Sequence, residues 1–127
     1  MKAGREALPH KILIVDDNRF ILQALAEHLE SQGYETMVAS NGQEALDLVK
    51  VEAPDLIIMD LVMPEMDGIE ATRRLRQEPK FKKIPIVAFT SQSNKGHVSD
   101  IFTDYLIKPF GFDKVIELLQ RLLGPLQ

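Results

Sequence analysis

The sequence predicts an α/β protein built on one doubly wound, five-stranded parallel sheet. Several short apolar runs are continuous rather than alternating, as in strands that are buried on both faces of a parallel sheet. Segments with helical periodicity separate these runs, and that alternation is typical of a sheet covered by helices on both sides, with right-handed crossovers. The length of 127 residues suits a single domain.

Continuous apolar runs at residues 12–15, 56–59, 86–89 and 105–107 predict four buried strands. A weaker candidate at residues 35–39 predicts a fifth, more exposed strand at an edge of the sheet.

Between the strands, apolar residues recur at helical spacing. Ile21, Leu22, Leu25 and Leu29 share one helical face, and Gly33 is a candidate C-terminal cap. Three later helical faces, each followed by proline or glycine, consist of Ala45, Leu46 and Val49; Ile69, Thr72 and Leu75; and Phe112, Val115, Ile116, Leu119, Leu122 and Leu123.

The composition is that of an ordinary folded domain. Hydrophobic residues make up 45% of the chain and charged residues 27%, cysteine is absent, and the formal net charge is -4. The absence of cysteine excludes disulfides and thiolate chemistry, and the negative charge argues against nucleic-acid binding by bulk electrostatics. No apolar run approaches the ~20 residues of a membrane-spanning helix. We expect a cytoplasmic protein with a flexible leader at 1–9, one domain at 10–124 and a tail at 125–127.

Polar residues follow several of the predicted strands. Asp16 and Asp17 follow the first run, and Asp60, Thr90 and Lys108 follow the last three. If the strand order is 2-1-3-4-5, these strands are neighbours and the side chains converge on one edge of the sheet. One aspartate after a strand is common in turns, but three carboxylates, a hydroxyl and an ammonium at equivalent ends indicate a site.

Physical chemistry limits what such a cluster can do. Two carboxylates about 4 Å apart repel by roughly 4 kcal/mol at an effective dielectric constant of 20, so three of them trap protons or bind a cation. Carboxylate oxygens suit Mg²⁺, which in turn attracts phosphate oxygens. Because aspartate can form an acyl phosphate, the cluster predicts a Mg²⁺-assisted phosphoryl acceptor.

Four segments, at residues 14–18, 59–68, 89–91 and 104–110, resemble the receiver domains of two-component response regulators, the CheY-like receivers. The resemblance covers nearly all of residues 10–123. It implies a flavodoxin-like receiver fold with the strand order 2-1-3-4-5.

The resemblance also implies roles for individual residues. Asp60 resembles the phosphoryl-accepting aspartate, Asp17 a direct ligand of Mg²⁺ (or Mn²⁺), and Asp16 a ligand that acts mainly through water. Val62 matches the position whose backbone carbonyl completes the metal shell.

Further positions match the switch of the family. Lys108 resembles the lysine that pairs with the phosphoryl group, and Lys108-Pro109 the family's cis peptide. Thr90 and Tyr105 resemble the hydroxyl and aromatic pair that moves on phosphorylation. Val62 and Gln92 match the variable positions that tune the lifetime of the phosphoryl group.

The implied function is signalling. The chain is expected to take a phosphoryl group from the phosphohistidine of a histidine kinase or a histidine phosphotransfer protein onto Asp60, and then to change conformation and control an output protein. It is expected to be no enzyme in the usual sense, but an acceptor that catalyses its own phosphorylation and slow dephosphorylation. We expect no direct nucleic-acid or membrane partner, and receivers of this kind can form homodimers.

Two alternatives remain open at this point. A flavodoxin-like mononucleotide binder has the same layers, although it normally needs a loop rich in glycine and hydroxyl groups where this chain is acidic. A pseudo-receiver would dock partners without taking phosphate, although the complete set Asp16, Asp17, Asp60, Thr90 and Lys108 argues against it.

The chain departs from the family in one stretch. Lys108 follows Thr90 by 18 positions, which is about one helical turn shorter than is usual in the family. Gly96 lowers helix propensity by about 1 kcal/mol relative to alanine. We therefore expect the fourth helix to be short, irregular or absent between Ser93 and Phe102.

Two further patterns have competing interpretations. Phe20 and Ile21 are either core residues or part of a docking patch, and we expect one of the two in the core. A basic segment is interpreted as a solvated helix face and loop rather than a nucleic-acid site; it comprises Arg73, Arg74, Arg76, Lys80, Lys82 and Lys83.

Overall fold

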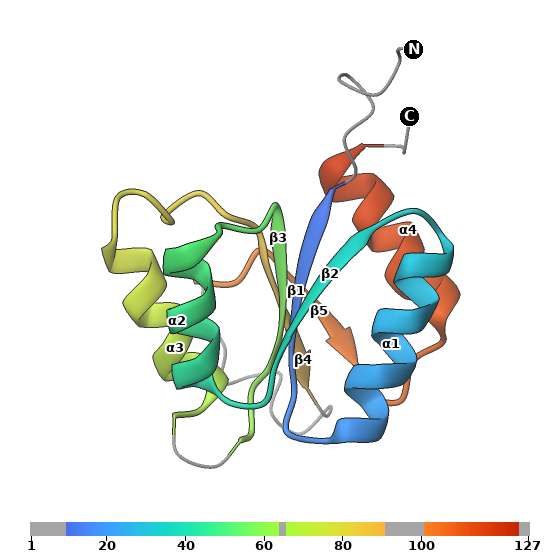
Figure 1. Cartoon of the computed structure of the whole chain (residues 1–127), viewed down its shortest axis with the longest axis horizontal. Coiled ribbons are helices and arrows are strands. Elements are labelled where there is room, and N and C mark those ends of the chain that lie inside the picture. Colours follow the sequence, from blue (N-terminus) through green and yellow to red (C-terminus); the bar gives the residue numbers. More distant parts are fainter. Residues whose placement is uncertain (1–9, 64–65, 91–100, 125–127) are drawn as a thin grey trace.

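The structure, a computed structural model, describes residues 10–63, 66–90 and 101–124. It confirms the predicted architecture: five parallel strands form one sheet in the order β2-β1-β3-β4-β5 (Figure 1). The strands are β1 (Lys11–Val15), β2 (Glu35–Ala39), β3 (Leu56–Asp60), β4 (Ile86–Thr90) and β5 (Asp104–Ile107).

Helices cover both faces of the sheet, as Figure 1 shows. The helices in the described residues are α1 (Arg19–Ser31), α2 (Gly42–Val51), α3 (Gly68–Gln77) and α4 (Phe112–Leu123). α1 and α4 lie on one face, and α2 and α3 lie on the other. The first three begin at side-chain caps, because the oxygens of Asn18, Asn41 and Asp67 accept backbone N–H groups of the first turn.

The sheet separates two apolar cores. Because successive strand residues point to opposite faces, Leu13 and Val15 pack towards α2 and α3, whereas Ile12 and Ile14 pack towards α1 and α4. All residues of β3 and β4 are buried, whereas β2 is partly exposed at the edge, as predicted. Burial on both faces explains why the inner strands are continuous apolar runs.

The predicted end of α1 is also confirmed. Gly33 has a φ of 101°, and its N–H donates to the carbonyl of Glu30 at 3.1 Å. A residue with a side chain is strained in this left-handed conformation, which accounts for the glycine.

Some predictions fall on parts of the chain outside the described residues. These are the leader at 1–9, the tail at 125–127 and most of the segment from Ser93 to Phe102. The irregular fourth helix therefore stays a prediction. Of the helices in the described ranges, none combines the length and the apolar character needed to cross a bilayer.

Candidate functional site

The carboxyl ends of β1, β3, β4 and β5 bring the predicted polar residues together. Asp16 and Asp17 follow β1, Asp60 and Thr90 end β3 and β4, and Lys108 follows β5. Carboxylate oxygens of Asp16, Asp17 and Asp60 all lie within 4.8 Å of one another. Asp16 and Asp60 are buried, whereas Asp17 is exposed to solvent. The convergence expected from the strand order is present.

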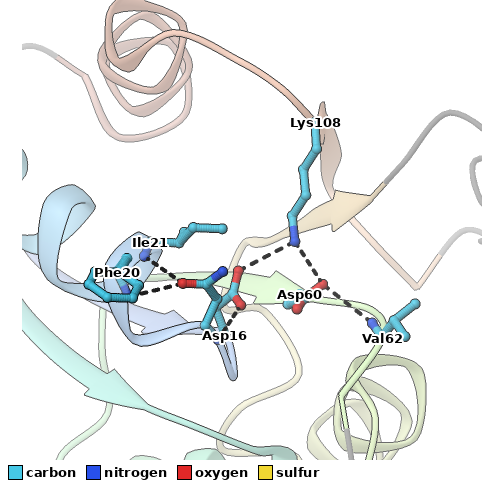
Figure 2. Close-up of polar contacts among 7 residues, drawn as sticks. Asp16, Phe20, Ile21, Asp60, Val62 and Lys108 are labelled. Atoms are coloured by element: carbon cyan, nitrogen blue, oxygen red, sulfur yellow. Dashed lines mark hydrogen bonds and ion pairs between the residues drawn. The ribbon is translucent and has the colours of Figure 1, made fainter.

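Lys108 joins the two buried carboxylates. Its Nζ lies 3.4 Å from Oδ2 of Asp16 and 3.3 Å from Oδ1 of Asp60, so one ammonium bridges both acids (Figure 2). The ammonium also lies 5.7 Å from the centre of the Phe89 ring, whose π-face favours a cation. Lys108 is therefore positioned to pair with a further negative group that binds beside Asp60.

The β1–α1 loop fixes the orientation of Asp16. Its Oδ1 accepts the backbone N–H of Asn18 at 2.8 Å. The Asn18 side chain in turn accepts the N–H groups of Phe20 and Ile21, at 2.9 and 3.2 Å, and caps the first turn of α1. Asn18 thus links the acidic site to the helix, a role that the sequence pattern alone did not assign.

Asp60 is positioned by the loop that follows it. Its Oδ1 accepts the N–H of Val62 at 3.3 Å. Asp67 caps α3, and Gly68 is the first residue of that helix. A Cβ at Gly68 would collide with the carbonyl oxygen of Asp60, so only glycine lets α3 approach this strand end.

The electrostatics of the site favour a cation. Burial, together with the negative charge of Asp16, raises the pKa of Asp60 to about 6, although Lys108 and the Val62 N–H act in the opposite direction. One ammonium therefore does not balance the carboxylates. A donor set of close carboxylate oxygens, with an exposed Asp17 open to water, fits Mg²⁺, which is bound through a few carboxylates and several waters.

The other predicted site residues are placed as follows. Thr90 is buried, and its carbonyl accepts the Lys108 N–H at 2.9 Å. Tyr105 is partly buried, with its ring 6.2 Å from that of Phe102. The Val62 side chain is exposed. The Lys108-Pro109 peptide bond is cis, as predicted, and Gln92 lies outside the described residues.

The expectation that Phe20 or Ile21 is a core residue needs correction. Phe20 is 85% exposed, and Ile21 is only partly buried against the core. Phe20 lies two residues before the buried Leu22, about 200° away around α1, so it faces solvent. Beside it lies an apolar groove of about 380 Å³, here called the α1–α4 groove; it is lined by Phe20, Ile21, Ala24, Pro109, Phe110 and Phe112, with Lys108 and Asn18.

This fold and this site together define a class: a doubly wound domain with an acidic, lysine-bridged cluster at the carboxyl edge of its sheet. Comparison with known proteins agrees. The family profile described as the response regulator receiver domain matches residues 12–120. The chain belongs to this family, whose members accept a phosphoryl group, bind Mg²⁺ in the acidic site and interact with histidine kinases and output partners.

Individual relatives are similar over almost their full length. The polar-differentiation response regulator DivK of Brucella anthropi is 36% identical over 121 residues, which cover 92% of this chain and 98% of the relative. The chemotaxis response regulator CheY4 of Vibrio cholerae superposes with a TM-score of 0.86 at 33% identity, covering 91% of this chain and all of that one.

A third relative is informative about the acidic site. The receiver domain of the sensor histidine kinase PA1611 of Pseudomonas aeruginosa has a TM-score of 0.84 and 30% identity, covering 93% of this chain and 100% of that chain. Its structure holds a magnesium ion in the active-site cleft.

Proposed function

We propose that Asp60 is the phosphoryl acceptor of this receiver domain and that Asp16, Asp17 and Asp60, with the carbonyl of Val62, hold Mg²⁺. The observation that carries the proposal is the buried Asp60 carboxylate, bridged to Asp16 by Lys108. Oδ1 of Asp60 accepts from Lys108 and Val62. Its second oxygen has no hydrogen bond among the described residues, and we assign it as the nucleophile.

The reaction needs little covalent chemistry from the protein. The second oxygen of Asp60 forms a bond to phosphorus while the P–N bond of the phosphohistidine breaks, and the imidazole leaves with the electron pair and takes a proton from water. Lys108 stabilises negative charge on the phosphoryl oxygens, since its Nζ is already within 3.3 Å of the accepting carboxylate. Bound Mg²⁺ would supply further charge neutralisation at the same oxygens.

The domain therefore catalyses its own phosphorylation and its own slow dephosphorylation. In the dephosphorylation step, water attacks phosphorus, the bond between phosphorus and the Asp60 oxygen breaks, and the carboxylate is regenerated with release of inorganic phosphate. The exposed Val62 side chain lies beside this carboxylate and, with Gln92, is proposed to tune how readily water reaches it.

We assign the conformational response to Thr90 and Tyr105. Thr90 is buried at the end of β4, and its register partner on β5 is Ile107, two residues after Tyr105. A hydroxyl drawn to the phosphoryl oxygen would pull on the β4–β5 pair, and the half-buried ring can follow it inward. Adding up to about two negative charges at Asp60 supplies the bias for this shift.

The proposal is tested by incubating the protein with Mg²⁺ and acetyl phosphate and weighing the intact chain. We expect the mass to rise by one phosphoryl group, no gain in excess EDTA, and the modified peptide to contain Asp60. No added phosphate, or a phosphate that persists at another residue, would instead support a docking module that has lost the acceptor function.

The phosphohistidine donor is proposed to dock on the α1–α4 groove. The groove borders Lys108, which contacts Asp60, so a protein seated there places a histidine next to the acceptor. It exposes Phe20 by 85% and Phe112 by 37%, and large exposed aromatic side chains are typical of interface anchors.

Phe20→Ala is expected to slow phosphotransfer from a phosphorylated histidine phosphotransfer protein by about tenfold or more, because truncation of an interface anchor costs at least 1–2 kcal/mol. Phosphorylation by acetyl phosphate should be unchanged, since this small donor does not need the groove. Val51→Ala, equally exposed on α2, is the matched control. Equal slowing with both donors would show that Phe20 acts on the chemistry and not on docking.

A further inference from the structure

A second groove lies at the opposite end of the sheet from Asp60. It has a volume of about 530 Å³ and lies where the chain enters β4 and β5. We call it the basic groove; it is lined by Arg76, Lys82, Lys83, Ile84, Pro85 and Phe102, with Ile101 and Thr103 at its side. Asp60 and Thr90 end their strands at the other edge, about 13 Å away along β4.

Arg76 corrects the interpretation of this segment as a plain solvated face. It is partly buried, and its guanidinium donates to three backbone carbonyls, those of Ile101, Lys82 and Ile84, at 2.7–2.9 Å. The arginine thus joins α3 to the chain before β4 and to the chain before β5. Its charge is fixed in the groove with no carboxylate partner in the described part of the chain.

Two lysines add exposed positive charge at the rim of the groove. Lys82 and Lys83 are exposed, and within residues 10–63, 66–90 and 101–124 no carboxylate pairs with either of them. None of the residues lining the groove is acidic. Three cations therefore share one concave surface on a chain whose net charge is -4.

We propose that the basic groove binds an acidic peptide segment of a partner protein, with carboxylates on Lys82 and Lys83 and apolar side chains against Ile84, Pro85 and Ile101. Charge complementarity selects the ligand, and the apolar floor adds buried contact area. A nucleic acid fits less well, because Phe102 is buried and the lining holds no exposed aromatic ring on which bases could stack.

The groove is also connected to the proposed switch. The Phe102 ring contacts the Tyr105 ring, and Thr103 is tied to the first residue of β4 by two hydrogen bonds, from Ile86 N to Thr103 Oγ1 and from Thr103 N to Ile86 O. A peptide seated in the groove therefore lies against the residues that lead into β4 and β5, the strand pair that the phosphorylated state would move. This coupling rests on the proposed acceptor function, whereas peptide binding itself does not.

Binding is tested by titrating the ¹⁵N-labelled, unphosphorylated full chain with a synthetic peptide of alternating acidic and leucine or phenylalanine residues. Amide signals of Lys82, Lys83 and Thr103 should shift, while that of Ala24 in the other groove should not. Raising the salt from about 50 to 300 mM should weaken binding several-fold, since the contacts are exposed ion pairs.

The Lys82→Glu/Lys83→Glu variant is expected to weaken binding by at least about tenfold, and its phosphorylation by acetyl phosphate should be unchanged. Lys50→Glu/Lys114→Glu has the same net charge and exposed sites elsewhere, and it should bind like the native chain. Equal loss in both double variants, no shift at millimolar peptide, or tighter binding of a single-stranded oligonucleotide would each overturn the proposal.

The same titration separates this inference from the acceptor function. Asp60→Asn should bind the peptide like the unphosphorylated native protein, whether or not Asp60 is the acceptor. After phosphorylation, a change in peptide affinity supports the coupling through Phe102. An unchanged affinity overturns that coupling and leaves the binding result standing.

Discussion

Replacing Lys108 with methionine is expected to slow phosphorylation by acetyl phosphate by about 10²–10³-fold at saturating Mg²⁺, the usual cost of removing one preorganised donor at a reacting oxygen. The transition state spreads negative charge over three phosphoryl oxygens, and the Lys108 ammonium lies within 3.3 Å of the Asp60 carboxylate, the proposed acceptor. Methionine keeps most of the side chain's length and removes its charge. The rate is measured as the gain in intact mass over time.

The control for this experiment is Lys114→Met. Lys114 is exposed on α4, and the same charge is lost without any contact to Asp16 or Asp60. Its rate should stay within about twofold of the native value, because surface substitutions away from a site have small effects. If the rate of the Lys108→Met variant also stays within twofold of the native rate, Lys108 takes no part in phosphorylation. An unfolding transition like that of the native protein shows that the variant is folded.

The part of the site on strand ends could be predicted because the physical rule is simple. Parallel strands end at one edge, so residues that follow apolar runs become neighbours whatever their separation in sequence. Asp16 and Lys108 are 92 positions apart and nevertheless form an ion pair. Here the continuous apolar runs specified the strands, and the strand order implied by the receiver resemblance made their carboxyl ends neighbours.

The parts that could not be predicted depend on contacts without a local pattern. Gly68 looks like a turn residue, and only the packed α3 reveals its contact with the Asp60 carbonyl. Arg76 belongs to a run of charges typical of a solvated face, yet carbonyls from two distant segments surround it. The exposure of Phe20, by contrast, follows from the helical spacing, because Phe20 lies about 200° around α1 from the buried Leu22.

Asp60→Asn is expected to raise the free energy of unfolding by about 2–3 kcal/mol at pH 7 in EDTA, while it abolishes phosphorylation. The pKa of Asp60 is raised from 3.8 to about 6 in the folded protein. Between these values the folded state binds more protons than the unfolded state, so the native protein loses stability as the pH rises through this window. Above about pH 6 the carboxylate is charged in both states and the full cost remains.

Urea unfolding of both proteins at several pH values checks the sign. The difference in the free energy of unfolding between the two proteins should be small near pH 4 and should grow until about pH 6. In this window the unfolded native sequence loses the Asp60 proton before the folded protein does, whereas the Asn variant has no proton to lose there. Asp47→Asn, an exposed carboxylate on α2, should change the stability by less than about 0.5 kcal/mol.

Addition of Mg²⁺ should reverse this order of stability. A cation that binds only the folded native site stabilises it by mass action, whereas the Asn variant has lost one of the three carboxylates that would hold the ion. If the Asn variant is instead the less stable protein at pH 7 without Mg²⁺, burial of the charged Asp60 carboxylate does not lower the stability of the folded protein. The excess negative charge on which the proposed Mg²⁺ site depends would then be absent.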